Sequence, residues 1–181
     1  MFKKEFVTHL LSTIIWLALI TLLRWSWHLN LIWFWLGGLV GTFLFDIDHW
    51  LYLLVVNPHE LTSQRVKHLL DQKRFKEASS LVVSTTQERI RLPLHNALFQ
   101  AILYILCFFV LTSTNNLLGA GLVMSLALHL LEDEFQDLKK DANHLRNWLF
   151  WQFKFEVSLQ NQKIYLVLMA LIFILLNLFL I

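Results

Sequence analysis

The stretch Gly41–Trp50 reads Gly-Thr-Phe-Leu-Phe-Asp-Ile-Asp-His-Trp, and it sets Asp46, Asp48 and His49 within a long apolar run. These three are the only acidic, basic or histidine side chains in residues 31–56. An unpaired carboxylate in a segment of membrane length is energetically costly, so such residues are candidates for function. The alternative is that a helix ends here at the membrane interface, although an interfacial end needs one polar residue rather than three.

The composition of the whole chain is that of an integral membrane protein. Hydrophobic residues make up 57% of its 181 residues, and the mean hydropathy of +0.56 lies above the range usual for soluble domains. The net charge of +2 is too small to favour nucleic acid as a partner. Cys107 is the only cysteine, so the chain has no disulfide framework. We therefore expect one all-α membrane domain over residues 1–181.

Apolar runs predict a polytopic bundle of about five membrane helices, since each needs about 20 residues to cross about 30 Å of hydrocarbon. The runs cover residues 6–23, 31–45, 93–112, 117–131 and 164–181, and the second can continue past the acidic cluster to residue 56. Two polar segments, 57–92 and 132–163, interrupt them. No small-residue cleavage site follows the first run, so we interpret it as an uncleaved membrane helix.

Lysine and arginine lie in alternate connections, which predicts the orientation because cytoplasmic loops are enriched in them. The basic regions are residues 3–4 and the two polar segments, whereas Arg24 is the only lysine or arginine between the first two runs. The loop 113–116 has neither residue type. We therefore expect a cytoplasmic N-terminus, an outer C-terminus and residence in the cytoplasmic (inner) membrane.

Three further patterns concern local structure. Residues 62–79 mix apolar and charged side chains, which favours an amphipathic helix on the inner membrane surface or a solvated linker helix. Residues 151–160 alternate strictly between apolar and polar, so we expect a small interfacial β element there. Gly37 and Gly41 form a small-xxx-small pair that permits close contact between helices.

A second group of polar residues lies in the fourth run. His129 and Asp133 are four residues apart and hence on one helical face. Such a pair can bind one metal ion, and a buried histidine hydrogen-bonded to a carboxylate is the common alternative. Counted from the outer ends of the runs at about 1.5 Å per residue, this pair, His9, Asp46 and His95 all lie roughly 18 to 25 Å across. We therefore expect four helices to bring them to one level near the cytoplasmic face.

Acidic residues gather at the carboxyl ends of two predicted helices, where the helix dipole disfavours anions. They are Asp46 and Asp48 after the second run, and Glu132, Asp133 and Glu134 after the fourth. An ion-pair network with Lys139, Lys140 and Arg91 could compensate this charge. A divalent ion held by carboxylates and imidazoles would also account for the histidines, and mixed nitrogen and oxygen ligands favour Zn, Mn or Fe over Ca or Mg.

Three motifs occur in order, each at a predicted membrane boundary: Phe45-Asp46-Ile47-Asp48-His49, Arg91-x-x-x-His95 and His129-Leu-Leu-Glu-Asp133. With His9 they resemble the YdjM-like family of membrane-bound metal-dependent hydrolases, over residues 9 to about 155. That family's pattern is an early His, a Pro-Asp-Ile-Asp-His box, a His-Arg-x-x-Thr-His-Ser box, and a His-x-x-x-Asp pair followed by Thr. The resemblance implicates His9, Asp46, Asp48, His49, Arg91, His95, His129 and Asp133.

The chain departs from this pattern at five positions. Phe45 replaces Pro, Ile90 replaces the first His of the second box, Leu94 and Asn96 replace Thr and Ser, and Gln136 stands at the final Thr. The histidine absent at Ile90 bears on catalysis more than on metal binding.

The motifs together predict a metal-dependent membrane hydrolase with its site at the cytoplasmic face. The expected ligands of one or two divalent transition-metal ions are His9, Asp46, His49, His129 and Asp133. The expected catalytic residues are His95 as ligand or general acid/base, Asp48 as the residue that orients a ligand histidine, and Arg91 as the group that binds a phosphate or carboxylate of the substrate. A site at the inner leaflet favours a lipid or phosphoester substrate.

Two other functions are consistent with the same residues. One is a cation- or proton-coupled transporter, although the ionisable groups stop at one membrane face. The other is a non-catalytic protein in which a metal ion locks the helix bundle, which would agree with the histidine absent at Ile90.

Overall fold

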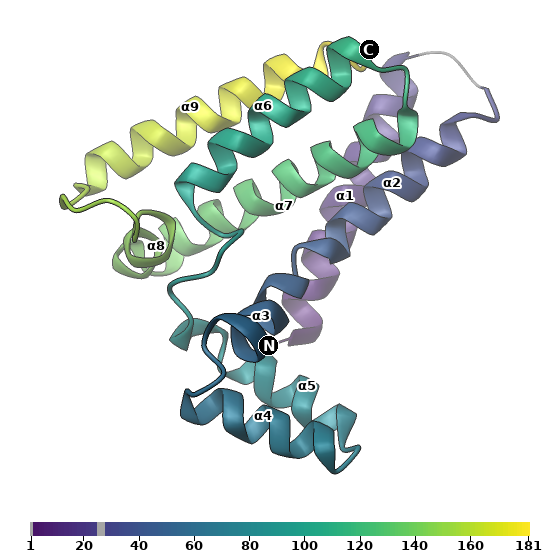
Figure 1. Cartoon of the computed structure of the whole chain (residues 1–181). Coiled ribbons are helices and arrows are strands. Elements are labelled where there is room, and N and C mark those ends of the chain that lie inside the picture. Colours follow the sequence, from purple (N-terminus) through teal and green to yellow (C-terminus); the bar gives the residue numbers. More distant parts are fainter. Residues whose placement is uncertain (1, 25–27) are drawn as a thin grey trace.

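The structure is a computed structural model that describes residues 2–24 and 28–181, and these form helices and loops without any strand (Figure 1). The elements are α1 (Phe2–Arg24), α2 (Leu31–Leu44), α3 (Ile47–Leu51), the π-helix η1 (Tyr52–Val56), α4 (Leu61–Asp71), α5 (Phe75–Ser84), the 3₁₀-helix η2 (Thr86–Glu88), α6 (Ala97–Ser113), α7 (Leu117–Lys140), α8 (Ala142–Leu149) and α9 (Leu159–Asn177). The predicted all-α class is confirmed for this part of the chain.

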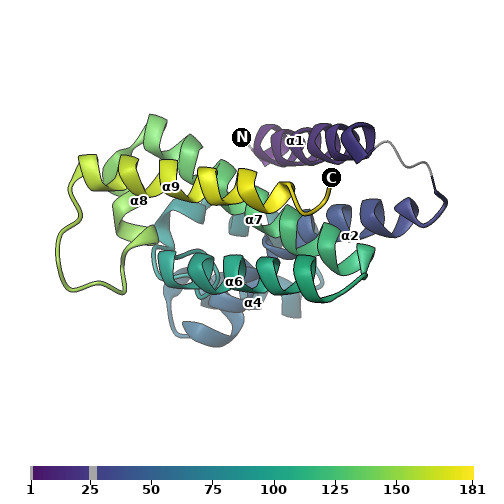
Figure 2. The ribbon, with the colours of Figure 1, turned by 90° about the horizontal axis from the view of Figure 1, so that it is seen from above.

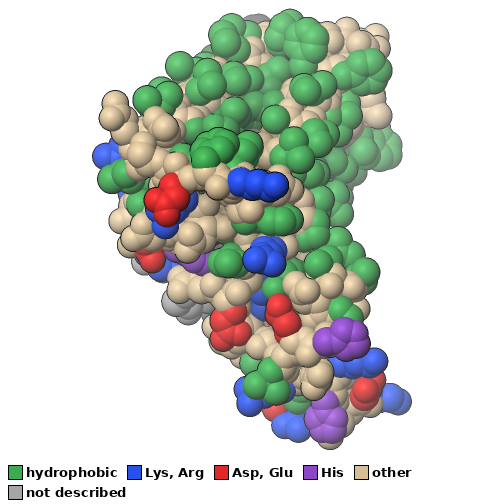
Figure 3. Space-filling view, turned by 60° about the vertical axis from the view of Figure 1, so that its left-hand side comes forward, with side chains coloured by type: hydrophobic (Ala, Val, Ile, Leu, Met, Phe, Trp, Pro, Cys, Tyr) green, Lys and Arg blue, Asp and Glu red, His purple; other side chains and the backbone are tan. Residues whose placement is uncertain are grey.

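Three helical segments are long and apolar enough to cross a membrane: Phe6–Arg24, Leu31–Val56 and Leu159–Asn177. Helix α6 is also apolar but shorter. Only 22% of the last of the three segments is buried within the protein, so most of its apolar side chains face outward. Figure 3 shows such side chains covering the upper part of the molecule, while charged side chains gather on its lower part. This distribution suits a protein whose upper part lies in lipid.

Helices α1, α2, α6, α7 and α9 run side by side, and consecutive ones run in opposite directions (Figures 1 and 2). Helix α7 contacts the other four. Its fully buried side chains Met124, Ala127 and Leu130 pack in one core with Leu17 of α1, Phe34 of α2 and Leu166 of α9. The bundle is therefore organised around α7.

Helices α2 and α7 pack so closely that their backbones are in contact. A Cβ atom added at Gly37 would lie 2.0 Å from the carbonyl oxygen of Leu118, and one at Gly121 would lie 2.1 Å from that of Phe34. A Cβ at Gly41 would lie 2.1 Å from Ser125 Oγ. The predicted close contact at Gly37 and Gly41 is confirmed, and Gly121 is its counterpart on α7.

The polar segment after η1 folds as two helices rather than the single helix expected over residues 62–79. Helix α4 ends at Asp71, and Lys73 adopts a left-handed backbone conformation with φ of 59°, which is typical of the residue that follows a helix. Helix α5 then returns along α4, and Val66 and Val82 pack with Leu53 of η1. This hairpin forms the lower lobe in Figure 1.

The interfacial β element expected over residues 151–160 is absent, and that prediction is wrong. Residues 151–158 form turns and irregular backbone, and α9 begins at Leu159 with Ser158 as its cap. The aromatic side chains of this stretch pack on each other instead, with ring centroids of Phe150 and Phe153 6.1 Å apart and those of Phe153 and Phe155 5.4 Å apart. A strand needs a partner for its backbone hydrogen bonds, and no described segment supplies one.

Candidate metal centre

The lower ends of the long helices bring four of the predicted site residues together. His9 comes from the first turns of α1, His95 from the segment that precedes α6, and His129 and Asp133 from successive turns of α7. All three imidazoles lie within 3.6 Å of the Asp133 carboxylate. The predicted meeting of these residues at one level is therefore confirmed.

His129 is fixed by the backbone of α2. Its Nδ1 lies 3.0 Å from the carbonyl oxygen of Thr42, which can only accept, so Nδ1 carries the proton. The other ring nitrogen, Nε2, lies 3.4 Å from Asp133 Oδ2. The close packing of α2 on α7 places this carbonyl, so the glycine contact sets the direction of the histidine.

His95 is fixed by a buried carboxylate in the same way. Its Nδ1 lies 3.0 Å from Oδ2 of Asp48, and that oxygen also accepts from the backbone N–H groups of Leu94 and His95. The Nε2 of His95 lies 3.6 Å from Asp133 Oδ2. Asp48 is fully buried, and it makes the contact expected of a residue that orients a histidine.

The third imidazole, His9, repeats the arrangement. Its Nδ1 lies 3.0 Å from Glu132 Oε2, an oxygen that also accepts from the hydroxyl of Ser12, and its Nε2 lies 3.1 Å from Asp133 Oδ1. The ring stacks on that of His129, with centroids 4.1 Å apart. Glu132 thus does for His9 what Asp48 does for His95.

Three Nε2 atoms consequently point at one carboxylate. If each Nδ1 carries the proton, each Nε2 presents a lone pair, and the Asp133 oxygens present lone pairs as well. Such groups repel at these distances unless a cation lies among them or the rings take up further protons. Ligand atoms of His9, His129 and Asp133 lie within 4.8 Å of one another, so this group can hold a metal ion. Histidines that donate their other N–H to an oxygen are the usual ligands of such ions.

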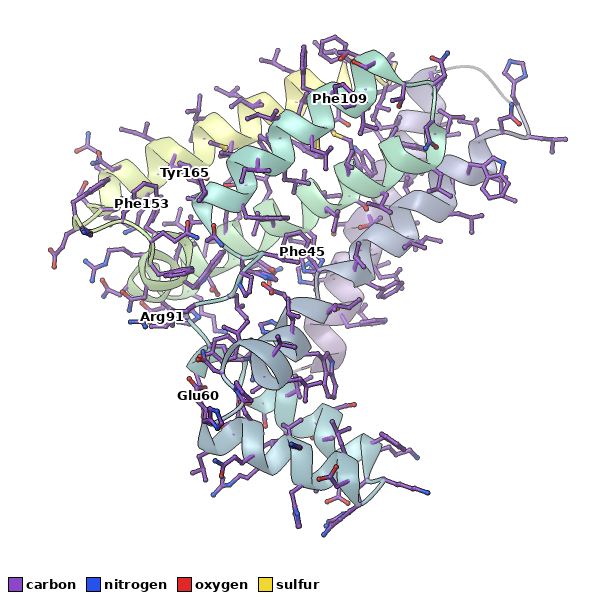
Figure 4. All side chains as sticks on the ribbon, viewed as in Figure 1. Phe45, Glu60, Arg91, Phe109, Phe153 and Tyr165 are labelled. Carbon is purple, nitrogen blue, oxygen red and sulfur yellow. The ribbon has the colours of Figure 1, made fainter. Side chains whose placement is uncertain are left out.

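The first motif lies between α2, which ends at Leu44, and α3, which begins at Ile47. Phe45 and Asp46 keep right-handed helical backbone angles, so Asp46 and Asp48 point in different directions, as expected for residues two apart on a helix. Asp48 turns inward to His95, while Asp46 is exposed and lines a cavity beside the histidines. Phe45, at the centre of Figure 4, is fully buried and contacts the rings of His95 and His129.

His49 differs from the other three histidines. Its Nδ1 accepts a hydrogen bond from Nε of Arg89 at 3.2 Å, so its proton lies on Nε2 and the ring has no free lone pair to offer an ion. Its ring stacks on that of His95, with centroids 5.5 Å apart. This arrangement makes His49 a hydrogen-bond donor to the cavity rather than the metal ligand expected from sequence.

Arg89, not Arg91, is the arginine at the site. Residues 89–96 are not helical, and the side chain of Arg89 is buried and lines the cavity, while Arg91 (labelled in Figure 4) is exposed and does not line it. Burial lowers the pKa of Arg89 to about 10, so it remains charged at neutral pH. The three departures in the second box are structural, because Ile90 and Leu94 pack against the core and Asn96 caps α6.

The cavity beside these residues has a volume of about 330 Å³, within the range of small-molecule sites. Its lining includes the exposed rings of Phe6 and Phe43, which stack with centroids 5.3 Å apart. It also includes Gln136 and Lys140 of α7. The candidate metal centre therefore opens to a space that a polar group with an apolar attachment can enter.

Comparison of the chain with protein-family models, with curated proteins and with solved structures found no match in any of the three.

Replacing Asp48 by asparagine is expected to weaken metal affinity about 10- to 100-fold, the usual cost of losing a carboxylate that orients a ligand histidine. The amide keeps the shape and one acceptor oxygen, which can still accept from the backbone N–H groups of Leu94 and His95, so the segment before α6 should keep its conformation. Titration of the purified protein with Zn²⁺ in competition with a chelator measures the change. An affinity equal to wild type would mean that His95 does not contact the ion.

Proposed function

We propose that this protein is a metal-dependent hydrolase of the membrane, with its site at the cytoplasmic face. The observation that carries the proposal is the convergence of the His9, His95 and His129 Nε2 atoms on the Asp133 carboxylate, each ring held by a hydrogen bond from its Nδ1. The resemblance of the motifs to the YdjM-like hydrolases supports the same conclusion.

In this proposal each residue of the site has a separate role. His9, His129 and Asp133 hold one divalent ion of Zn, Mn or Fe, His95 completes the set, and Asp46 is placed to reach the ion or a second one from the cavity. A divalent ion in such a site activates water and polarises the bond to be broken. Asp48 and Glu132 keep the histidines in the tautomer that leaves Nε2 free.

The membrane arrangement is part of the proposal. We take α6 and the first part of α7 as two further spans, which makes five with the three that length and apolarity support. The positive charge of the connections supports a cytoplasmic N-terminus and a site on the cytoplasmic side. A lipid or a phosphoester that reaches the site from the inner leaflet is then the proposed substrate class.

The test is the metal content of the detergent-solubilised protein, measured for wild type, Asp46→Ala and His129→Ala. We expect one or two equivalents of a transition metal in wild type and little in His129→Ala. A partial loss in Asp46→Ala would place Asp46 among the ligands. Hydrolysis of a panel of phosphoesters and lipids by the loaded wild type then tests the activity.

Two outcomes would redirect the proposal. If the wild-type protein takes up no added metal, protonated imidazoles must supply the positive charge beside Asp133. The cluster would then be an ion-pair or proton-relay network. Tight metal binding without turnover of any ester would favour a metal ion that only locks the bundle. Ion flux through proteoliposomes distinguishes the transporter from both.

A further inference from the structure

Arg89 is a buried cation whose hydrogen-bond partners among the described residues are all uncharged. Its guanidinium donates to His49 Nδ1 at 3.2 Å, to Thr85 Oγ1 at 2.9 Å and to the carbonyl oxygen of Val82. None of these acceptors carries a negative charge, and no carboxylate of the described residues lies within salt-bridge distance of Arg89. The carboxylates of Glu60 and Glu88 act on Arg89 only from beyond that distance. Because a buried charge is costly unless it is paired directly, an anion bound in the cavity would stabilise Arg89.

The guanidinium also has N–H groups that make no hydrogen bond within the described residues. It carries five N–H groups, of which these bonds use three. Further donors line the same cavity. Among them are the Nε2–H of His49, whose Nδ1 is occupied by Arg89, and the side-chain amide of Gln136, whose nitrogen is buried without a hydrogen-bond partner. Converging donors around one cation are the usual means of binding a phosphate or carboxylate.

The position of these donors relates the anion to the metal centre. His49 stacks on His95, whose Nε2 points at Asp133, so His49 lies next to the candidate metal centre, and Arg89 and Gln136 line the same cavity. The cavity also carries the carboxylates of Asp46, Asp133 and Asp137. These would repel an anion in the absence of the metal, so anion binding should depend on the ion.

We propose that Arg89, with His49 and Gln136, forms a phosphate-binding subsite next to the metal ion, and that the substrate of the proposed hydrolase is a phosphoester. This inference rests on the proposed function. A tetrahedral phosphate offers several acceptor oxygens, which suits three donors on different elements. The exposed Phe6 and Phe43 at the edge of the cavity would contact an apolar chain attached to that phosphate.

The experiment measures binding of inorganic phosphate to the metal-loaded full-length protein by calorimetry. Arg89→Gln should weaken phosphate affinity by at least about tenfold, because a hydrogen bond to a charged group is worth more than that factor. Arg91→Gln is the matched control, since Arg91 is exposed and outside the cavity, and its affinity should match wild type. Removing the metal with a chelator should abolish phosphate binding.

Metal content, measured on the same samples, separates the two proposals. A wild type that holds metal but binds no phosphate overturns the subsite and leaves the hydrolase proposal in place, whereas a wild type without metal overturns both. Unchanged phosphate affinity in Arg89→Gln, with metal retained, also overturns the subsite. If Arg89→Gln loses its metal, Arg89→Lys is measured instead, because lysine keeps the charge but lacks the forked donors of arginine. Weaker phosphate binding by Arg89→Lys supports the subsite, and unchanged phosphate affinity overturns it.

A second ligand identifies the source of the phosphate. Dihexanoyl phosphatidic acid, added below its critical micelle concentration, should bind more tightly than inorganic phosphate if the phosphate belongs to a lipid. Phe43→Ser should then remove that advantage without changing the affinity for inorganic phosphate. Equal affinity of the two ligands supports a water-soluble phosphoester at the same subsite.

Discussion

Replacing Asp133 by asparagine is expected to abolish metal binding. Asp133 is the residue on which all three histidines converge, with Nε2 distances of 3.1, 3.4 and 3.6 Å to its two oxygens. Losing a residue that only orients a ligand costs up to about 100-fold in affinity, so losing the central ligand should cost more than about 100-fold. Metal analysis after gel filtration checks this directly.

Thermal unfolding provides a second measurement of the same variant. A ligand at 100 times its dissociation constant stabilises the folded state by about 2.7 kcal/mol, so added metal should raise the melting temperature of wild type. It should not raise that of Asp133→Asn. A metal-induced shift that persists in the variant would mean that the ion binds elsewhere.

Asp137→Asn is the matched control for this experiment. Asp137 lies one turn further along α7 and lines the same cavity, but its Oδ2 is occupied by the indole N–H of Trp148 at 2.8 Å. We expect this variant to keep both its metal and its metal-induced shift. Loss of metal in both variants would extend the site along α7 and would favour two ions over one.

The sequence allowed the site to be located before the structure was known, and the reason is physical. Charged groups in apolar helices cost free energy, so the few that occur are candidates for function. His9, His129 and Asp133 could be brought to one level by counting residues along straight helices, and the structure places them within contact distance. Gly37 and Gly41 likewise revealed the helix contact, because only small residues allow backbones to approach so closely.

The residues that the sequence could not assign lie where the backbone is not a regular helix. The motif resemblance indicated Arg91, whereas Arg89 lines the cavity, because both precede α6 in a non-helical segment whose direction depends on tertiary contacts. Helical spacing separates Asp46 from Asp48, but which of the two meets His95 depends on how the segment before α6 packs. Glu132 was visible as an acidic neighbour of Asp133, but its contact with His9 depends on how α1 packs on α7.

The wrong prediction of a β element has a similar cause. Alternation of apolar and polar residues identifies a strand only if another strand can pair with it. In a helical protein, the alternating rings of Phe153 and Phe155 pack against each other, and Val157 is buried next to the cap of α9. Phe153, Phe155 and Val157 are therefore stacked or buried without a strand, whereas Trp151 and Leu159 of the same pattern are exposed.

Replacing Gly121 by alanine is expected to destabilise the protein strongly and to lower its metal content. The added Cβ would lie 2.1 Å from the Phe34 carbonyl oxygen and 2.9 Å from the Gly38 nitrogen. Both are backbone atoms that no rotamer change can move, so the cost should reach or exceed about 3 kcal/mol, the upper end of the usual range for overpacking. Unfolding of the detergent-solubilised protein by heat measures the loss of stability.

The effect on the metal follows from the position of His129, which lies eight residues, or about 12 Å, along α7 from Gly121. Separating α2 from α7 would lengthen the 3.0 Å contact between His129 Nδ1 and the Thr42 carbonyl, and the imidazole would lose its fixed direction. Gly119→Ala is the matched control, because a Cβ there meets nothing closer than 3.3 Å and alanine favours the helix by about 1 kcal/mol. If Gly121→Ala binds metal as tightly as Gly119→Ala, the helix contact supports stability alone and does not position the histidine.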